Sequence, residues 1–187
     1  MTDEDIRNLG PLAPLAGIWE GDKGKDRAPS DSRGVALSDY RERMTFEPTG
    51  RVDSHEQILY GLRYSTVARR LGHEVGFHEE LGYWLWDAAN EQVMRCFLIP
   101  RGIALIAGGT VKADAKQFDI AADLGSQTYG IVSNRFLDVE FQTVRYELKI
   151  TILGDDSFRY EEDTVMRVKG QGELFHHTDA NTVRRVK

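Results

Sequence analysis

Apolar and polar residues alternate along most of this chain. Around residue 43, Tyr40, Met44 and Phe46 occupy one set of alternate positions, and Arg41 and Arg43 occupy the other. Successive side chains of an extended strand point to opposite faces, so this period of two predicts a strand with one buried face. Similar runs predict further strands at 57–64, 77–86, 92–99, 103–111, 117–122, 131–136, 139–153 and 158–169.

The connections between these runs are short and contain turn residues, as at 100–102 and 154–157. With one more strand around Trp19, about ten strands follow one another, and no helix of crossover length separates them. This order is typical of an antiparallel up-and-down meander. Because an open sheet would leave edge strands that invite aggregation, we expect an all-β fold closed into a barrel.

Two segments lie outside the strand pattern. Residues 2–9 begin with a capping threonine and acidic side chains, which predict one or two helical turns that stop at Gly10-Pro11. We expect this segment to form a short helical lid over one end of the barrel. Residues 23–38 are polar and contain glycine, proline and serine, so they predict a long mobile loop at a barrel mouth.

Composition narrows the class of protein. The 187 residues are 41% hydrophobic and 29% charged, which suits a single domain over 1–187. The net charge of −6 and the scattered basic residues argue against a nucleic-acid partner. Cys96 is the lone cysteine, and no apolar run has the length of a signal peptide or membrane span. We therefore expect a cytoplasmic protein with no membrane partner; the sequence leaves open a homodimer.

Trp19 lies between Gly17 and Gly21 near the N-terminus. Glycine lets two backbones approach closely, and a large indole can plug one end of a barrel if its N–H finds a partner. The alternative is a buried tryptophan of any β protein. We expect Trp19 to be buried at the closed end, and we count all three residues as candidates for contact with a cofactor.

Histidines supply the clearest candidates for chemistry. His176 and His177 follow the last predicted strand, where a histidine at the rim can reach the lumen. Adjacent residues in an extended segment point in opposite directions, so the two are not expected to share one ion, and a solvated or capping pair is the alternative. His78 and Glu80 fit no metal or acid–base motif, but either one facing inward would hydrogen-bond a ligand.

Two further tryptophans belong to the predicted strand 77–86. Trp84 and Trp86 share one face of this strand, and Tyr83 lies on the other. We expect the two indoles to face the lumen and to contact a ligand there. An apolar ligand should then quench tryptophan fluorescence.

Three segments of the chain resemble the nitrobindin family. They are 12–21, with a Gly-Xaa-Trp-Xaa-Gly pattern, the strand 78–84, and the ending 170–183. The family favours another glycine after the first pattern, and here that glycine is displaced by one residue to Gly24. Residues 23–38 and 63–72 are also longer than in the haem-binding pattern of the family.

The resemblance implies a fatty-acid-binding-protein-like barrel of ten antiparallel strands with a short helical lid. In haem-binding members it also implies an iron atom ligated by a histidine close to the C-terminus. On this resemblance His176 is the expected ligand of haem b iron, and His177 is its substitute. We expect His177 to point away from the lumen, toward the local turn.

These observations lead to three hypotheses about function. The first is a protein that binds a small, mostly apolar ligand in the lumen, with haem as the leading candidate. The second is a ferric haem protein that binds nitric oxide and isomerises peroxynitrite to nitrate, so catalysis is expected only with haem. The third is a fatty-acid or lipid carrier, which needs an arginine inside the lumen; Arg95, Arg145 and Arg159 are the candidates.

Overall fold

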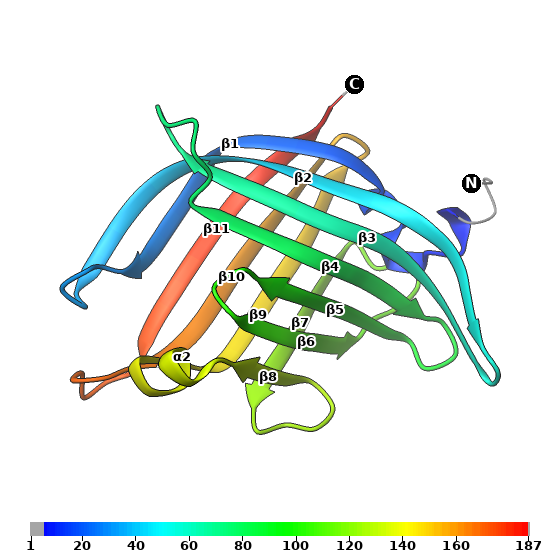
Figure 1. Cartoon of the computed structure of the whole chain (residues 1–187). Coiled ribbons are helices and arrows are strands. Elements are labelled where there is room, and N and C mark those ends of the chain that lie inside the picture. The colour runs from blue at the N-terminus through cyan, green and yellow to red at the C-terminus, as the bar shows by residue number, and fades with distance from the viewer. Residues whose placement is uncertain (1–5, 187) are drawn as a thin grey trace.

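A computed structural model describes residues 6–186 of the chain. These residues form one closed barrel, and helix is limited to short segments outside it (Figure 1). The predicted all-β barrel is confirmed, with eleven strands rather than about ten. The elements are η1 (Gly10–Leu15), β1 (Gly17–Pro29), β2 (Val35–Ser54), β3 (Gln57–Arg70), β4 (His78–Asp87), β5 (Gln92–Ile99), β6 (Ile103–Thr110), β7 (Gln117–Leu124), β8 (Gly130–Ser133), α2 (Arg135–Glu140), β9 (Phe141–Gly154), β10 (Ser157–Val168) and β11 (Phe175–Arg185).

Antiparallel pairing of sequence neighbours builds most of the ring. The strand order is β1-β11-β10-β9-β7-β8-β6-β5-β4-β3-β2, and β1 pairs with β2 to close it. The short strand β8 is the exception, because it pairs antiparallel with β6 and parallel with β7. The barrel is therefore mixed at this one place rather than wholly antiparallel.

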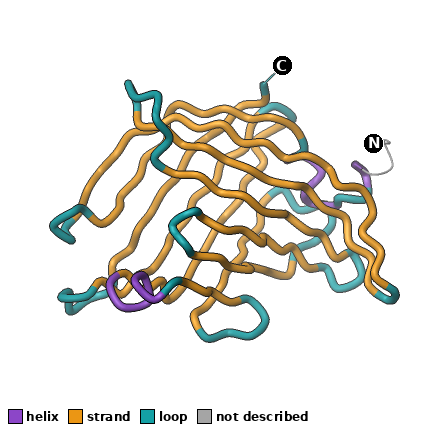
Figure 2. Tube along the Cα trace, in the orientation of Figure 1, coloured by secondary structure: helices purple, strands orange, loops and turns teal. Residues whose placement is uncertain are grey.

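The prediction of a long loop at 23–38 is wrong. Strand β1 runs to Pro29 and β2 starts at Val35, so only a tight turn separates two long paired strands (Figure 2). Strand β3 likewise continues to Arg70, six residues beyond the predicted end at Tyr64. The sequence pattern did not indicate that β1 and β2 extend through 23–38, because the inward-facing side chain there, Asp26, is polar although it is buried.

The sequence pattern predicted no strand at Phe175–Arg185, where the structure has β11. It pairs with β10 from Phe175 to Arg184 and with β1 from Thr178 to Arg185, so it is the strand that closes the barrel. Its inward positions include His177, Asp179 and Asn181, which give no apolar alternation. Pairing with two neighbours supplies the backbone hydrogen bonds that stabilise this polar segment.

Two expectations about local helix also need correction. The strand predicted at 131–136 ends at Ser133, and Asn134 instead accepts a hydrogen bond from the Leu137 amide, 3.0 Å away, to cap α2. The turns predicted for 2–9 lie partly outside the described residues, and the lid is η1, which starts at the expected stop because proline suits a first helical turn. No helix within 6–186 is long and apolar enough to cross a membrane.

Trp19 closes the end of the barrel under η1. It is buried, as predicted, and its indole Nε1 donates to the Leu15 carbonyl at 2.7 Å. Its ring meets Phe158 edge-on, with 4.9 Å between centroids, and the Arg185 guanidinium lies 4.2 Å from the ring centroid. Gly17 has φ +129, and a Cβ there would lie 2.5 Å from Arg185 Nη1. Glycine is needed for this close packing.

The displaced glycine of the N-terminal pattern has a structural explanation. The register between β1 and β2 shifts between Gly21 and Gly24, as it does where a β-bulge adds residues to one strand. A Cβ at Gly24 would collide with the Tyr40 ring, so the close approach of this ring requires glycine. The bulge therefore places Gly24 directly against the Tyr40 ring of β2, where only a glycine fits.

Candidate functional site

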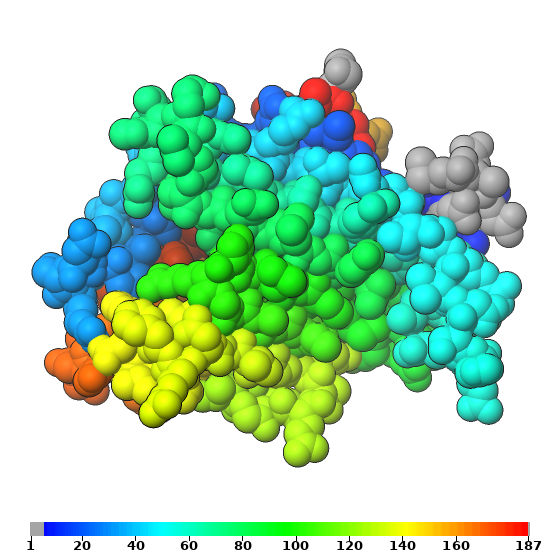
Figure 3. All heavy atoms as spheres, viewed as in Figure 1, coloured from blue at the N-terminus to red at the C-terminus, as the bar shows by residue number. Residues whose placement is uncertain are grey.

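The lumen contains a cavity of about 510 Å³ that opens at the end of the barrel opposite η1. We call this opening the mouth; the β1–β2 turn, residues 71–77 and α2 surround it. Figure 3 shows the hollow between the β1–β2 hairpin (blue) and α2 (yellow). Its volume is in the range of small-molecule sites. The polar residues that line it are Asp26, Tyr40, Glu42, Tyr64, Thr66, Arg70, His78, Glu79, Glu80, Arg95, Arg101, Tyr160, Glu162, His177 and Asp179.

Arg95 on β5 is the centre of a buried ionic cluster in the lumen. Its Nη2 contacts Glu80, and its Nη1 lies 3.1 Å from Glu162 Oε2. The same guanidinium donates to the hydroxyls of Tyr64, at 2.8 Å, and Tyr146. Each tyrosine in turn donates to one of the two carboxylates. The cluster is thus a network in which every carboxylate is paired with the same cation.

The charges of this cluster depend on one another. Burial by itself raises the pKa of Glu80, but the Arg95 charge and a hydrogen bond from His78 outweigh it and lower that pKa to about 2. Burial lowers the pKa of His78, yet the hydrogen bond and negative charge of Glu80 leave it raised. Glu80 is therefore ionised at neutral pH. The contact with Glu80, 3.1 Å away, stabilises the charged form of His78.

A second network lies closer to the mouth. Asp179 Oδ2, the Tyr40 hydroxyl, the Tyr160 hydroxyl and Glu42 Oε1 form a chain with contacts of 3.2, 2.5 and 2.9 Å. Asn181 Nδ2 donates to the same Glu42 oxygen at 2.7 Å. The three contacts of the chain need three hydrogens and the two hydroxyls supply two, so one carboxyl group must carry the third.

The pKa values agree with this hydrogen count. Burial raises the pKa of Glu42 to about 7 even though Asn181 and Tyr160 donate to its carboxylate. Burial, and then the carboxylates of Glu162 and Glu42, raise the pKa of Asp179 well above its ordinary value. Both raised pKa values favour a protonated carboxyl group in this network.

Replacing Glu42 with Gln should flatten the pH dependence of stability. The folded pKa lies above the unfolded value of 4.5, so the folded state keeps a proton that the unfolded chain releases, and stability falls as pH rises from about 4.5 to 7. Over this pH range the free energy of unfolding of the wild type should fall by up to about 3 kcal/mol because of Glu42. The free energy of unfolding of Glu42→Gln should not show this fall. Urea unfolding at pH 5 and 8 measures the difference, with the outward-facing Glu47→Gln as control. Parallel curves for wild type and Glu42→Gln would contradict the assignment.

The two C-terminal histidines face opposite sides of the barrel wall, in the reverse of the expected orientation. The side chain of His176 is 56% exposed, points outward and makes a 2.7 Å contact from Nδ1 to Asp163 Oδ2. His177 lines the cavity, with Nε2 3.0 Å from Oδ1 of the buried Asp26. The register explains this: His177 shares the face of Asp179 and Asn181, whose side chains bond inside the barrel.

The other candidate residues separate into two regions. His78 and Trp84 line the cavity, and Trp84 and Trp86 are both buried on the inner face. Trp86 lies deeper, at the closed end, where its indole would touch a Cβ at Gly10. Trp19 also lies at the closed end, together with Gly17 and Gly21, and none of these three is among the residues that line the cavity.

Most polar lumen residues were missed by sequence reasoning. The sequence indicates Arg95 only as a partner of a fatty acid and Tyr40 only as a member of an alternating strand, and Glu42 and Glu162 match no motif. A signal was present, because Glu162 interrupts the apolar face of its strand. A charged residue at an inward position needs a buried partner, so such an interruption indicates a lumen network. No group of three or more potential metal ligands occurs within 6–186.

Comparison with known proteins gives a family for this chain. The model of the THAP4-like, heme-binding beta-barrel domain matches residues 8–185. The crystal structure of Rv2717c from M. tuberculosis is similar in fold, with a TM-score of 0.69 and 21% identity over 96% of this chain and 98% of that chain. No curated protein matches the sequence. Because the family model spans nearly the whole barrel, the chain belongs to the THAP4-like, heme-binding β-barrel family, the nitrobindin family.

Proposed function

We propose that the barrel binds a small ligand in its lumen, and that this ligand is haem b held by His177. The observation that carries the proposal is the imidazole of His177 on the wall of an open cavity, in a chain of a haem-binding family. Neutral imidazole is a common ligand of haem iron. His176 has no part in this proposal, because its side chain points to the outside.

The residues around His177 suit a ligand of this kind. A carboxylate that bonds one ring nitrogen of a histidine fixes its orientation and leaves the other nitrogen for a metal, and Asp26 stands in that position. Phe77, Met44 and Ala68 supply apolar wall of the cavity.

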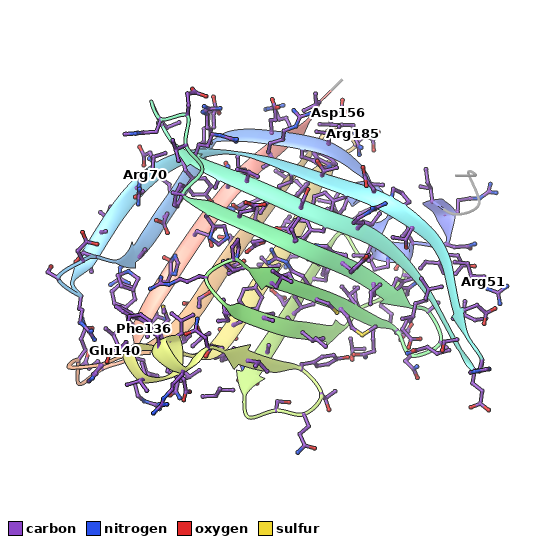
Figure 4. All side chains as sticks on the ribbon, in the orientation of Figure 1. Arg51, Arg70, Phe136, Glu140, Asp156 and Arg185 are labelled. Carbon is purple, nitrogen blue, oxygen red and sulfur yellow. The ribbon has the colours of Figure 1, made fainter. Side chains whose placement is uncertain are left out.

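Cationic side chains lie where the carboxylates of such a ligand would emerge. Arg70 and Arg101 line the cavity at its mouth, and Arg70 stacks with its guanidinium 4.8 Å from the Phe77 ring centroid. Figure 4 shows Arg70 at one side of the mouth, and Phe136 and Glu140 of α2 at another. Arginine pairs well with carboxylates, so these residues would orient propionate groups toward solvent.

The protein's own contribution would be orientation and exclusion of water. Asp26 would hold the imidazole, and the buried indoles of Trp19 and Trp86 would keep the interior closed on the side away from the mouth. Bound haem would supply a coordination position for nitric oxide or peroxynitrite, so both activities depend on haem uptake. Catalysis is accordingly a secondary proposal.

The fatty-acid carrier is less well supported. Arg145 and Arg159 lie on the outer face, where they pair with Asp123, Glu147 and Glu161. Arg95 is inside the lumen, but its charge is already balanced by two carboxylates. A fatty-acid carboxylate that reached Arg95 would therefore meet a cation whose charge is already balanced.

Titration with haemin tests the proposal directly. The absorption spectrum of the wild-type protein should show a shifted Soret band that saturates near one equivalent of haemin, with quenching of tryptophan fluorescence. Oleate serves as the comparison ligand and should bind more weakly. An unshifted Soret band in excess haemin would refute the haem proposal, and the peroxynitrite hypothesis would fall with it.

A further inference from the structure

Two buried hydrogen-bond donors, in two residues that line the cavity, have no partner within residues 6–186. They are the indole Nε1 of Trp84 and the guanidinium Nε of Arg95, and we call them the donor pair. The two side chains are 2% and 4% exposed, and both residues line the cavity. They are direct neighbours across β4 and β5, so the two donors belong to one region of the wall.

The Arg95 side chain is fixed in a way that leaves only this one donor. Its two terminal nitrogens bond the carboxylates of Glu80 and Glu162 and the hydroxyls of Tyr64 and Tyr146. These four bonds from opposite sides hold the guanidinium plane in place. The N–H at Nε is the single donor of the group that the protein itself does not use.

The charge of the region disfavours an anion as the natural partner. The carboxylates of Glu80 and Glu162 already face the Arg95 guanidinium, and His78 contacts Glu80. A third negative charge would find no unmatched cation there, and its burial would be costly. A neutral acceptor oxygen adds no charge, and it satisfies N–H groups whose burial without a partner costs about 1–3 kcal/mol each.

We propose that the donor pair forms a subsite for an uncharged acceptor group, such as the carbonyl oxygen of an amide, ester or ketone, on a ligand with an apolar body. The inference rests on the proposed function, because it requires that the lumen takes a ligand. It concerns a ligand other than haem b, which carries no uncharged carbonyl oxygen, and it assigns the acceptor group of that ligand to Trp84 and Arg95.

The surroundings of the donor pair suit the apolar body of such a ligand. The Trp84 ring meets Phe118 edge-on, and the Arg95 guanidinium lies 4.1 Å from the Phe97 ring centroid. Leu148 and Ile150 of β9 line the same cavity. The donor pair therefore has apolar neighbours as well as the ionic cluster, in a buried interior where a hydrogen bond is stronger than in water.

Calorimetric titration with decanamide and decanoate at pH 7 tests the subsite. The two probes share one chain and differ in the charge of the head group. Decanamide should bind the wild-type protein at least about 10-fold more tightly than decanoate. Trp84→Phe keeps an aromatic ring but removes the N–H, so it should weaken decanamide binding by about 5-fold, as expected for one hydrogen bond.

Trp86→Phe is the matched control, because it makes the same chemical change in a buried indole that does not line the cavity. It should leave decanamide affinity within about 2-fold, and circular dichroism should show that both variants fold. Equal affinity for the two probes, absence of decanamide binding, or full affinity in Trp84→Phe would each overturn the subsite. The haemin titration measures binding at His177 separately from decanamide binding. Failure of the subsite is therefore distinguished from failure of the proposed function.

Discussion

Haemin added to the His177→Ala variant should give no ferric imidazole spectrum, whereas the wild-type protein should give one. The imidazole of His177 lines the cavity and is held by Asp26, and its removal takes away the proposed iron ligand. Loss of an outer partner of a metal ligand already costs about 10- to 100-fold in affinity, so loss of the ligand itself should cost at least that much. Absorption titration of both proteins under the same conditions measures the effect.

His176→Ala is the matched control for this experiment. It removes an identical side chain one residue away, but that side chain faces outward and contacts Asp163 on the outer surface. The variant should bind haemin as the wild type does. If His176→Ala loses the spectrum and His177→Ala keeps it, the iron ligand is not His177 and the proposed geometry of the site is wrong.

The orientation of the two histidines could have been read from the sequence once a strand over 175–185 was recognised. Phe175 and Val183 are its buried apolar residues, and both have odd numbers. His177 shares their parity, so it faces the lumen, and His176 faces outward. The strand escaped recognition because polar residues hold the inward positions between Phe175 and Val183.

Two strands with a mostly apolar inner face were predictable almost to the residue. The predicted strand at 92–99 is β5, and the predicted strand at 158–169 is β10 to within one residue at each end. Burial of apolar side chains fixes the register of such strands, and the same burial produces the alternating pattern in the sequence. The barrel follows from them, because closure removes the sheet edges.

The candidate site was predictable only in part. Where polar side chains face the lumen, a strand shows no alternation of apolar and polar residues that would indicate its buried face. Asp26, Glu42 and Asp179 face inward as carboxyl groups that bond to distant strands. Their partners lie between 118 and 151 residues away in the sequence, so no local spacing reveals them. The alternation shows which positions share a face, but it leaves open which polar groups meet across the barrel.

Replacing Trp19 with Ala should destabilise the barrel by about 3–5 kcal/mol, the cost typical of removing a large aromatic side chain from a core. The indole fills the closed end, so its loss leaves a cavity beside Phe158 and removes the 2.7 Å bond to the Leu15 carbonyl. Urea unfolding followed by far-UV circular dichroism measures the change without relying on tryptophan emission. Tyr83→Ala, an aromatic truncation on the outer face where the ring is 47% exposed, should cost less than about 1 kcal/mol. Equal losses in the two variants would mean that Trp19 does not hold the closed end together, and that η1 and Arg185 stabilise it without the indole.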